Sequence, residues 1–122
     1  MNINDSSQIN VLSTKMQRIQ QNIDKYKKIV NYLTDLNSDL SNISGKIKNA
    51  ITGCLNGGFN DKGNPFGNGL MEETLNSVNY NISEINTLIS KNTKQINQLE
   101  SEIIIIKDKI KKEKDKLILS DV

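Results

Sequence analysis

The sequence has no tryptophan and no histidine, and it has one cysteine and one proline among 122 residues. Because histidine is absent, nucleophile–base pairs built on imidazole are excluded, and tetrahedral zinc sites lack their usual ligands. Cys54 has no second cysteine with which to form a disulfide, so we expect a free thiol. We therefore predict that the protein is not an enzyme and that it binds no metal and no cofactor.

Long apolar runs and a strong excess of one charge are also missing. The longest uninterrupted apolar run is Ile103–Ile106, whereas a helix that spans a bilayer needs about 20 residues. Residues 1–8 lack the basic start and apolar stretch of a secretory signal peptide. The 16 basic and 14 acidic residues nearly balance, and only 4% of the residues are aromatic, which argues against nucleic acid as a partner. We expect a cytoplasmic protein that is exported, if at all, by a route independent of a signal peptide.

Glycine and proline are concentrated in one stretch of the chain. Six of the seven glycines and the only proline fall between Gly53 and Gly69, and Gly45 is the single exception. Both residue types interrupt regular structure, and long segments almost free of them flank this stretch. The pattern predicts an all-α fold, an antiparallel two-helix coiled-coil hairpin in one domain over residues 1–122. The expected parts are a helix over 6–51, a glycine-rich connector over 53–69 and a helix over 70–119.

The connector does not match a known ligand-binding loop. Its glycines do not form a phosphate-binding pattern, and it contains a single carboxylate, Asp61, where a calcium loop needs several. Phe59 and Phe66 are the only phenylalanines of the chain. We expect them to fold back over the open end of the hairpin, with a partner-binding tip as the alternative.

The first predicted helix carries a heptad repeat, whose positions are lettered a to g. Apolar residues occupy the a and d positions, which form the seam between paired helices: Ile9, Leu12, Met16, Ile19, Ile23, Tyr26, Val30 and Leu33. The next a positions hold Asn37 and Ser44, and the apolar row moves sideways there to g positions, which are Ile29, Leu36, Ile43 and Ala50. Leu40, Ile47 and Ile51 continue the original stripe, so we expect a face wider than a single seam.

The second predicted helix has the more regular repeat. Its seam is interrupted only by Asn92 and Glu113 and comprises Met71, Leu75, Val78, Ile82, Ile85, Ile89, Ile96, Leu99, Ile103, Ile106, Ile110 and Leu117. Asn92 either fixes the register, as polar seam residues can, or is simply tolerated. Aligning Ile51 with Met71 matches the two seams over their full lengths.

Three features of the hairpin predict a surface for another helix. They are the apolar g row (Ile29, Leu36 and Ile43), the isoleucines outside the second seam (Ile104 and Ile105) and the lysines that flank its end (Lys107, Lys109, Lys114 and Lys116). Charges beside a seam select the partner helix, so these lysines favour an acidic helix from another chain. The alternative is a solvated, lysine-rich helix end.

The length, the two helices around a glycine-rich turn and the isoleucine-rich second repeat resemble the WXG superfamily of helical hairpins linked to type VII secretion. They resemble especially the accessory proteins that accompany LXG toxins in Gram-positive bacteria of low GC content. The family's Trp-x-Gly turn is missing, and the nearest aromatic-to-glycine spacing is Phe59 to Gly63 or Phe66-Gly67. Tyr80 and Glu84 have the four-residue spacing of the family's export signal, but they lie early in the second helix, where we interpret them as ordinary surface residues.

The resemblance implies an accessory, adaptor or targeting chaperone for a secreted toxin, with the toxin's helical N-terminal region or a paralogous hairpin as the partner. The first alternative is a self-assembling coiled-coil scaffold of a phage or cell envelope, which would be a homo-oligomer. The second is a peripheral membrane protein that uses its lysine-rich end, although no Trp or Phe anchor accompanies those lysines.

Overall fold

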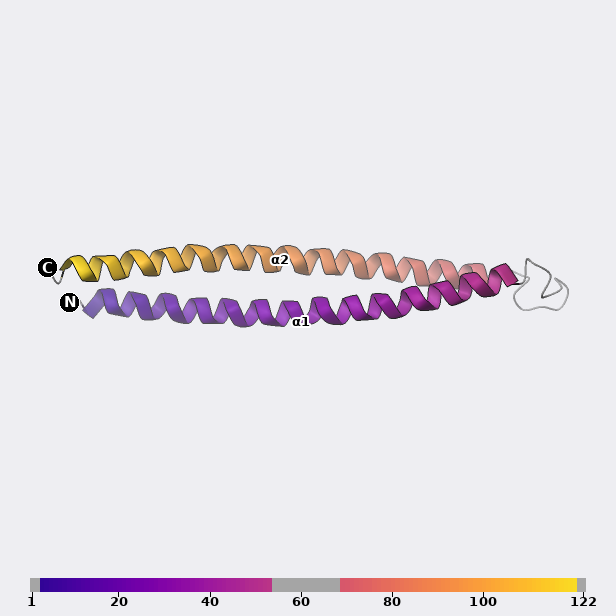
Figure 1. The fold of residues 1–122 in the computed structure, drawn as a ribbon, viewed down its shortest axis with the longest axis horizontal. Helices are drawn as coiled ribbons and strands as arrows, with labels where there is room; N and C mark the ends of the chain where they lie inside the picture. The colour runs from indigo at the N-terminus through magenta and orange to yellow at the C-terminus, as the bar shows by residue number, and fades with distance from the viewer. Residues whose placement is uncertain (1–2, 54–68, 121–122) are drawn as a thin grey trace. The chain divides into compact units, whose positions relative to one another are not determined.

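The structure, a computed structural model, describes residues 3–53 and 69–120 and consists of two long helices. Helix α1 spans Ile3–Gly53 and helix α2 spans Leu70–Ser120, and they pack against each other as an antiparallel hairpin (Figure 1). The all-α hairpin is therefore confirmed. α1 begins three residues before its predicted start and ends two residues after its predicted end. Cys54, Phe59 and Phe66 lie outside the described residues, so the predictions made for them stay predictions.

The start of α2 depends on the backbone of Gly69. This residue has a φ of 77°, in the left-handed region that side chains with a Cβ rarely adopt. Its carbonyl accepts the backbone N–H of Glu73 at 2.9 Å, which is the first hydrogen bond of the helix. Glu72 and Glu73 place negative charge in the first turn, where the helix dipole stabilises it. Gly69 thus supplies the backbone conformation and the first carbonyl acceptor with which α2 begins.

The contacts of the chain group into two compact units, which we describe separately. Unit 1 combines residues 1–30 with residues 91–122, and unit 2 comprises residues 31–90. Each unit contains one segment of α1 beside one segment of α2. The prediction of a single domain stays a prediction.

Unit 1 has an apolar core at the predicted seam. Ile23 is its most buried member, with 1% of its surface exposed. The buried residues are Ile19, Ile23, Ile96, Leu99, Ile103, Ile106 and Ile110, and Ile9, Leu12, Met16, Tyr26 and Val30 pack against them. All of these residues occupy a or d positions, so the heptad repeat alone explains this core.

Unit 2 has a different seam, in which polar side chains replace apolar ones. Ser44 is the one buried residue among the described residues of this unit, and its hydroxyl donates to Oδ1 of Asn79 at 2.9 Å. Nδ2 of Asn37 donates to Oδ1 of Asn86 at 2.8 Å and to the carbonyl of Ile82 at 3.3 Å. These two polar layers lie one heptad apart on both helices. The hydrogen bonds join α1 to α2 where apolar packing is weak.

These bonds concern the a positions at which the apolar row of α1 is interrupted. α2 supplies asparagines that bond to Nδ2 of Asn37 and to the hydroxyl of Ser44, so these polar a positions stay in the interface beside the apolar g row. The predicted alignment places Asn37 opposite Ile85 and Ser44 opposite Val78. The two bonds between side chains go instead to the next residue of α2, Asn86 and Asn79, so the predicted register agrees to within one residue.

Candidate interaction surface

The residues predicted to bind a partner are accessible in the structure. Ile29 and Ile43 are exposed by 45% and 44%, Ile104 and Ile105 by 67% and 55%, and Leu36 is half-buried. The four predicted lysines, Lys107, Lys109, Lys114 and Lys116, are all exposed. Large apolar side chains left in water suggest a protein–protein interface.

The structure does not bring all of these residues to one side of the helix pair. When two helices pair antiparallel through their a and d positions, the g positions of both helices lie on one side of the pair and the e positions lie on the other. The c positions lie next to g, farther from the partner helix, and the b positions lie next to e in the same way. We call these the g side and the e side. Lys109, Lys116 and Ile105 belong to the g side. Lys107, Lys114 and Ile104 belong to the e side, so the lysine set divides into two surfaces.

Exposed apolar side chains favour the g side in both units. Among the described residues, the large exposed ones at g or c positions are Val11, Ile29, Tyr32, Ile43, Leu70, Leu88, Ile105 and Leu119. Those elsewhere are Ile104 and Ile118 at b positions and Tyr80 at an f position. Within each unit the g side and the e side therefore differ in chemistry.

In unit 2 the g side carries an apolar strip formed by Tyr32, Leu36, Ile43 and Leu88. The register fixed by the Asn37–Asn86 bond places Leu36 and Leu88, a g position on each helix, at the same level. Tyr32 is exposed by 69% and Leu88 by 46%. We name these four residues the g-side strip.

The e side of unit 2 is closed by polar groups. Asn79 and Asn86 occupy e positions of α2 and extend toward the a positions of α1, where they meet Ser44 and Asn37. The e positions of α1 in this unit are Thr34, Ser41 and Lys48, so no apolar side chain faces outward there. Among the described residues of unit 2, the large exposed apolar side chains lie on the g side, apart from Tyr80 on the outer face of α2.

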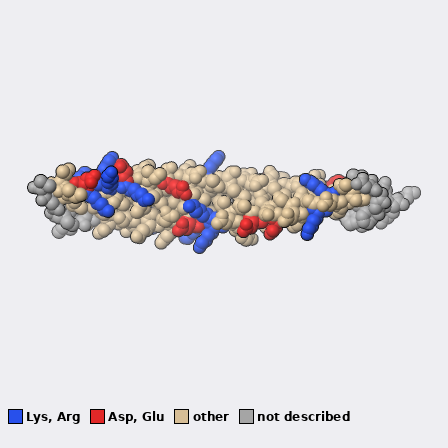
Figure 2. Space-filling view, in the orientation of Figure 1, with Lys and Arg blue, Asp and Glu red and all other residues tan. Residues whose placement is uncertain are grey.

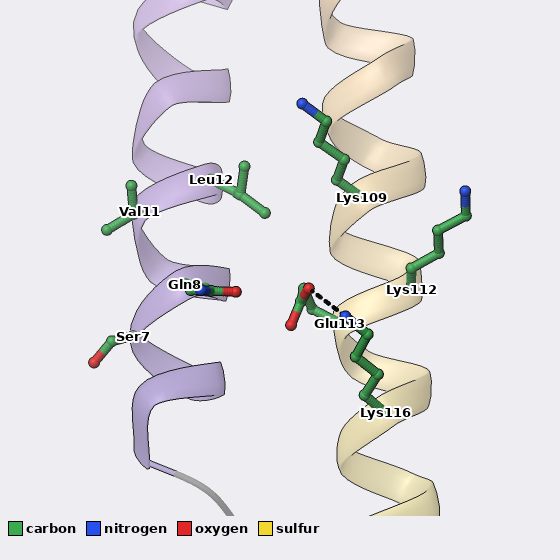
Figure 3. Close-up of a pocket in the computed structure, with 8 residues that line it drawn as sticks. All are labelled: Ser7, Gln8, Val11, Leu12, Lys109, Lys112, Glu113 and Lys116. Atoms are coloured by element: carbon green, nitrogen blue, oxygen red, sulfur yellow. Dashed lines mark hydrogen bonds and ion pairs between the residues drawn. The ribbon is translucent and has the colours of Figure 1, made fainter.

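In unit 1 the g side is a groove between α1 and α2. One depression of about 470 Å³ is lined by Ser7, Gln8, Val11, Leu12, Lys109, Lys112, Glu113 and Lys116. A second of about 240 Å³ is lined by Lys15, Glu102, Ile105, Ile106 and Lys109, and the two share Lys109. Figure 3 shows Leu12 and Glu113 pointing into the space between the helices. We name these two depressions together the basic groove.

The charges around the basic groove are mostly positive. Lysine and arginine gather over the part of unit 1 where α1 begins and α2 ends (Figure 2). Lys116 pairs with Glu113 at 3.2 Å and Lys112 with Asp108 at 3.1 Å. Among the residues that the structure describes, Lys15 and Lys109 have no ion-pair partner. Two cations at the rim are therefore left for an external acid.

Three of the candidate interface residues were not predicted from the sequence. Val11, Tyr32 and Leu88 are exposed by 67%, 69% and 46% and occupy c or g positions. The signal was present, because extending the g row from α1 to α2, and then outward to the c positions, finds all three. When the heptad positions of each helix are considered alone, an apolar surface formed by both helices is missed.

The remaining predicted features lie on the surface or carry no ligand cluster. Tyr80 is exposed by 64%, and Glu84, one turn later on α2, is exposed as well. Within residues 3–53 and 69–120, no group of three His, Cys, Asp or Glu side chains could hold a metal ion. In the same ranges neither helix has an apolar segment that would suffice to cross a membrane. Asn92 is half-buried in the seam, and its effect on register stays a prediction.

No family model matches this chain, and comparisons with curated proteins and with solved structures find no significant match. The comparisons therefore add no family to the helical hairpin, and the resemblance to the WXG superfamily stays a prediction.

Proposed function

We propose that this protein is a non-enzymatic helical adaptor that binds the helices of another chain, acting as an accessory protein or targeting chaperone for a type VII-like secreted toxin of the LXG kind. The single observation that carries the proposal is the g-side strip of unit 2. A two-helix pair whose seam contains polar layers and whose g side is apolar gains stability when a further helix covers that side.

The size of the strip fits helix packing. A helix that covers Tyr32, Leu36, Ile43 and Leu88 removes four large side chains from water, three of which are exposed by 44% to 69%. Burying such a side chain fully contributes about 1.5 to 3 kcal/mol, and these start partly buried, so each contributes roughly half of that. The partner in this proposal is the helical N-terminal region of the toxin, which the resemblance implies.

Co-expression with the N-terminal region of the LXG-type toxin encoded nearest to this protein tests the proposal. The tagged hairpin is expected to retain the toxin region through purification, and the double variant Ile43→Ser/Leu88→Ser is expected to lose it. The matched control is Ile104→Ser/Ile118→Ser, which removes two exposed apolar side chains from the e side. Equal loss in both variants, with unchanged circular dichroism, would argue against a g-side interface.

A self-assembling scaffold is the second candidate, and one observation favours it. Residues 1–30 and 91–122 carry 13 basic and 8 acidic residues, a net charge of +5, whereas residues 31–90 carry 3 basic and 6 acidic residues, a net charge of −3. Opposite charges let unit 1 of one copy attract unit 2 of another. If this candidate holds, Ile43→Ser/Leu88→Ser dissociates a homo-oligomer that the wild-type protein forms without any partner.

A further inference from the structure

We propose that the basic groove of unit 1 is a docking site for an acidic amphipathic helix, one with an apolar row flanked by Asp or Glu side chains. This inference rests on the proposed function only for the source of the helix. The chemistry of the site follows from unit 1 alone.

The shape of the groove fits a helix. Its two depressions follow one another along the junction between α1 and α2, since they share Lys109. Leu12 and Ile106 form the floor, and Val11 and Ile105 form apolar rims on the two helices. Val11 and Ile105 are exposed by 67% and 55%, so an occupant that covers them buries substantial apolar surface. An occupant lying along this junction packs its own apolar row between two helices, which is the arrangement of a helical bundle.

The positive charge at the rim of the groove favours an acidic helix over a basic one. Lys15, Lys109 and Lys116 occupy the g positions at its rim, and Arg18 lies one turn beyond Lys15 on α1. Glu113 is turned inward, with 15% of its side chain exposed, and it pairs with Lys116. Glu102 is then the one acidic side chain of the lining that has no cation paired with it among the described residues. A helix with lysines beside its apolar row would meet repulsion here, and one with acids would meet Lys15 and Lys109.

The opposite side of unit 1 provides an internal comparison. The e-side lysines Lys27, Lys107 and Lys114 match the g-side set in number and in their division between the helices. Lys27 already pairs with Glu100 at 3.5 Å, across the two helices. None of the e-side lysines lines either depression of the groove. The three lysines at g positions are therefore matched by three at e positions, and the groove with its apolar floor is what differs between the two sets.

A direct binding test uses designed peptides, so its result does not depend on finding the natural partner. The probe is a fluorescein-labelled four-heptad peptide with Leu and Ile at a and d and Glu at e and g. The controls are the same peptide with Lys, and with Gln, at e and g. Fluorescence anisotropy with the full-length protein is expected to show saturable binding of the acidic peptide, weakened by added salt, and much weaker binding of the other two.

Matched variants then locate the site. Lys15→Gln/Lys109→Gln/Lys116→Gln is expected to weaken binding of the acidic peptide at least about tenfold. Lys27→Gln/Lys107→Gln/Lys114→Gln removes the same charge from the e side and is expected to change affinity less than about twofold, since it leaves the groove intact. Ile105→Ser and its neighbour Ile104→Ser form a second pair, in which only Ile105→Ser is expected to weaken binding. Circular dichroism on each variant checks that the helices remain.

Four results would overturn the proposal. They are failure of the acidic peptide to bind, equal binding of the lysine peptide, equal loss in the g-side and e-side lysine variants, and exclusion of the peptide by a stable homo-oligomer. If the hairpin retains the toxin region but does not bind the acidic peptide, this inference is wrong and the proposed function holds. If it binds the acidic peptide but not the toxin region, the proposed function is wrong and this inference holds.

Discussion

Replacing Asn37 by leucine should stabilise the hairpin, although it removes two hydrogen bonds. Asn37 lies at an a position, where Nδ2 donates to Asn86 and to the carbonyl of Ile82. Its Oδ1 is buried, and within the described residues it has no hydrogen-bond partner. The side-chain amide therefore has a partner for its donor and none for its buried acceptor, which is unfavourable because a buried polar atom without a hydrogen bond has lost its contact with water.

The expected change in the free energy of unfolding is the sum of three contributions. Removing a buried, unpaired acceptor gains about 1 to 3 kcal/mol, and placing part of a leucine side chain in the seam gains roughly 1 kcal/mol. The two lost hydrogen bonds each cost about 0.5 to 1.5 kcal/mol, while Asn86 is exposed and turns to water. The balance is a stabilisation of about 1 kcal/mol. Because polar seam residues restrict pairing, we also expect Asn37→Leu to self-associate more readily than the wild type.

Urea unfolding followed by circular dichroism measures this change. The control is Asn42→Leu, at an exposed position of the same helix, which makes the same change in helix propensity without a seam contact. Asn42→Leu should alter the free energy of unfolding by less than about 0.5 kcal/mol. A destabilised Asn37→Leu, or an equal gain in both variants, would show that the polar layer does not weaken unit 2 in the way we describe.

Four further substitutions should change the free energy of unfolding, each measured by urea unfolding. Ile23→Ala should cost about 2 to 5 kcal/mol, because Ile23 is 1% exposed in the core of unit 1, and a cost below roughly 1 kcal/mol would contradict that core. Gly45→Ala should stabilise the protein by about 1 kcal/mol, because alanine favours a helix and a Cβ at this site meets nothing within 4 Å. Gly69→Ala should destabilise it by about 1 to 2 kcal/mol, because Gly69 has a positive φ, although a Cβ there also meets nothing within 4 Å. Changes of the same sign in the two variants would refute this contrast. Lys27→Ala should cost less than about 1 kcal/mol, because its pair with Glu100 is half-exposed, and a larger loss would mean the pair is not a solvated one.

The helices and their pairing could be predicted because their causes are local. A heptad repeat determines which face of each helix is apolar, and matching two such faces determines the register. The seam of unit 1 therefore lies where the sequence places it, from Ile9 to Val30 and from Ile96 to Ile110. The predicted helix ends differ by up to three residues, since end positions depend on capping geometry such as that of Gly69.

The polar layers could not be predicted in the same way, because they depend on side chains that meet across the pair. Asn37 and Ser44 interrupt the apolar repeat of α1, and periodicity alone interprets them as a break in the seam. Their partners, Asn79 and Asn86, lie at e positions of α2 that appear as ordinary surface when α2 is considered alone. Only when the two helices are paired is it seen that Asn37 meets Asn86 and that Ser44 meets Asn79. These two contacts form layers one heptad apart.

The division of the lysines has the same origin. Along α2 the basic residues form one cluster, from Lys107 to Lys116. Packing against α1 separates Lys109 and Lys116, which line the groove, from Lys107 and Lys114, which do not. A sequence reports the composition of a helix end, whereas the side that each residue faces depends on the second helix.

Light scattering coupled to size exclusion tests the proposed adaptor function most directly, on the purified protein alone and after co-expression with the toxin region. We expect a monomer of 13.7 kDa when the protein is alone, with low resistance to urea, and a defined, more stable complex with the toxin region. A stable homo-oligomer that leaves the toxin region unbound would contradict this function, because the g-side strip would then be covered by a second copy of this chain.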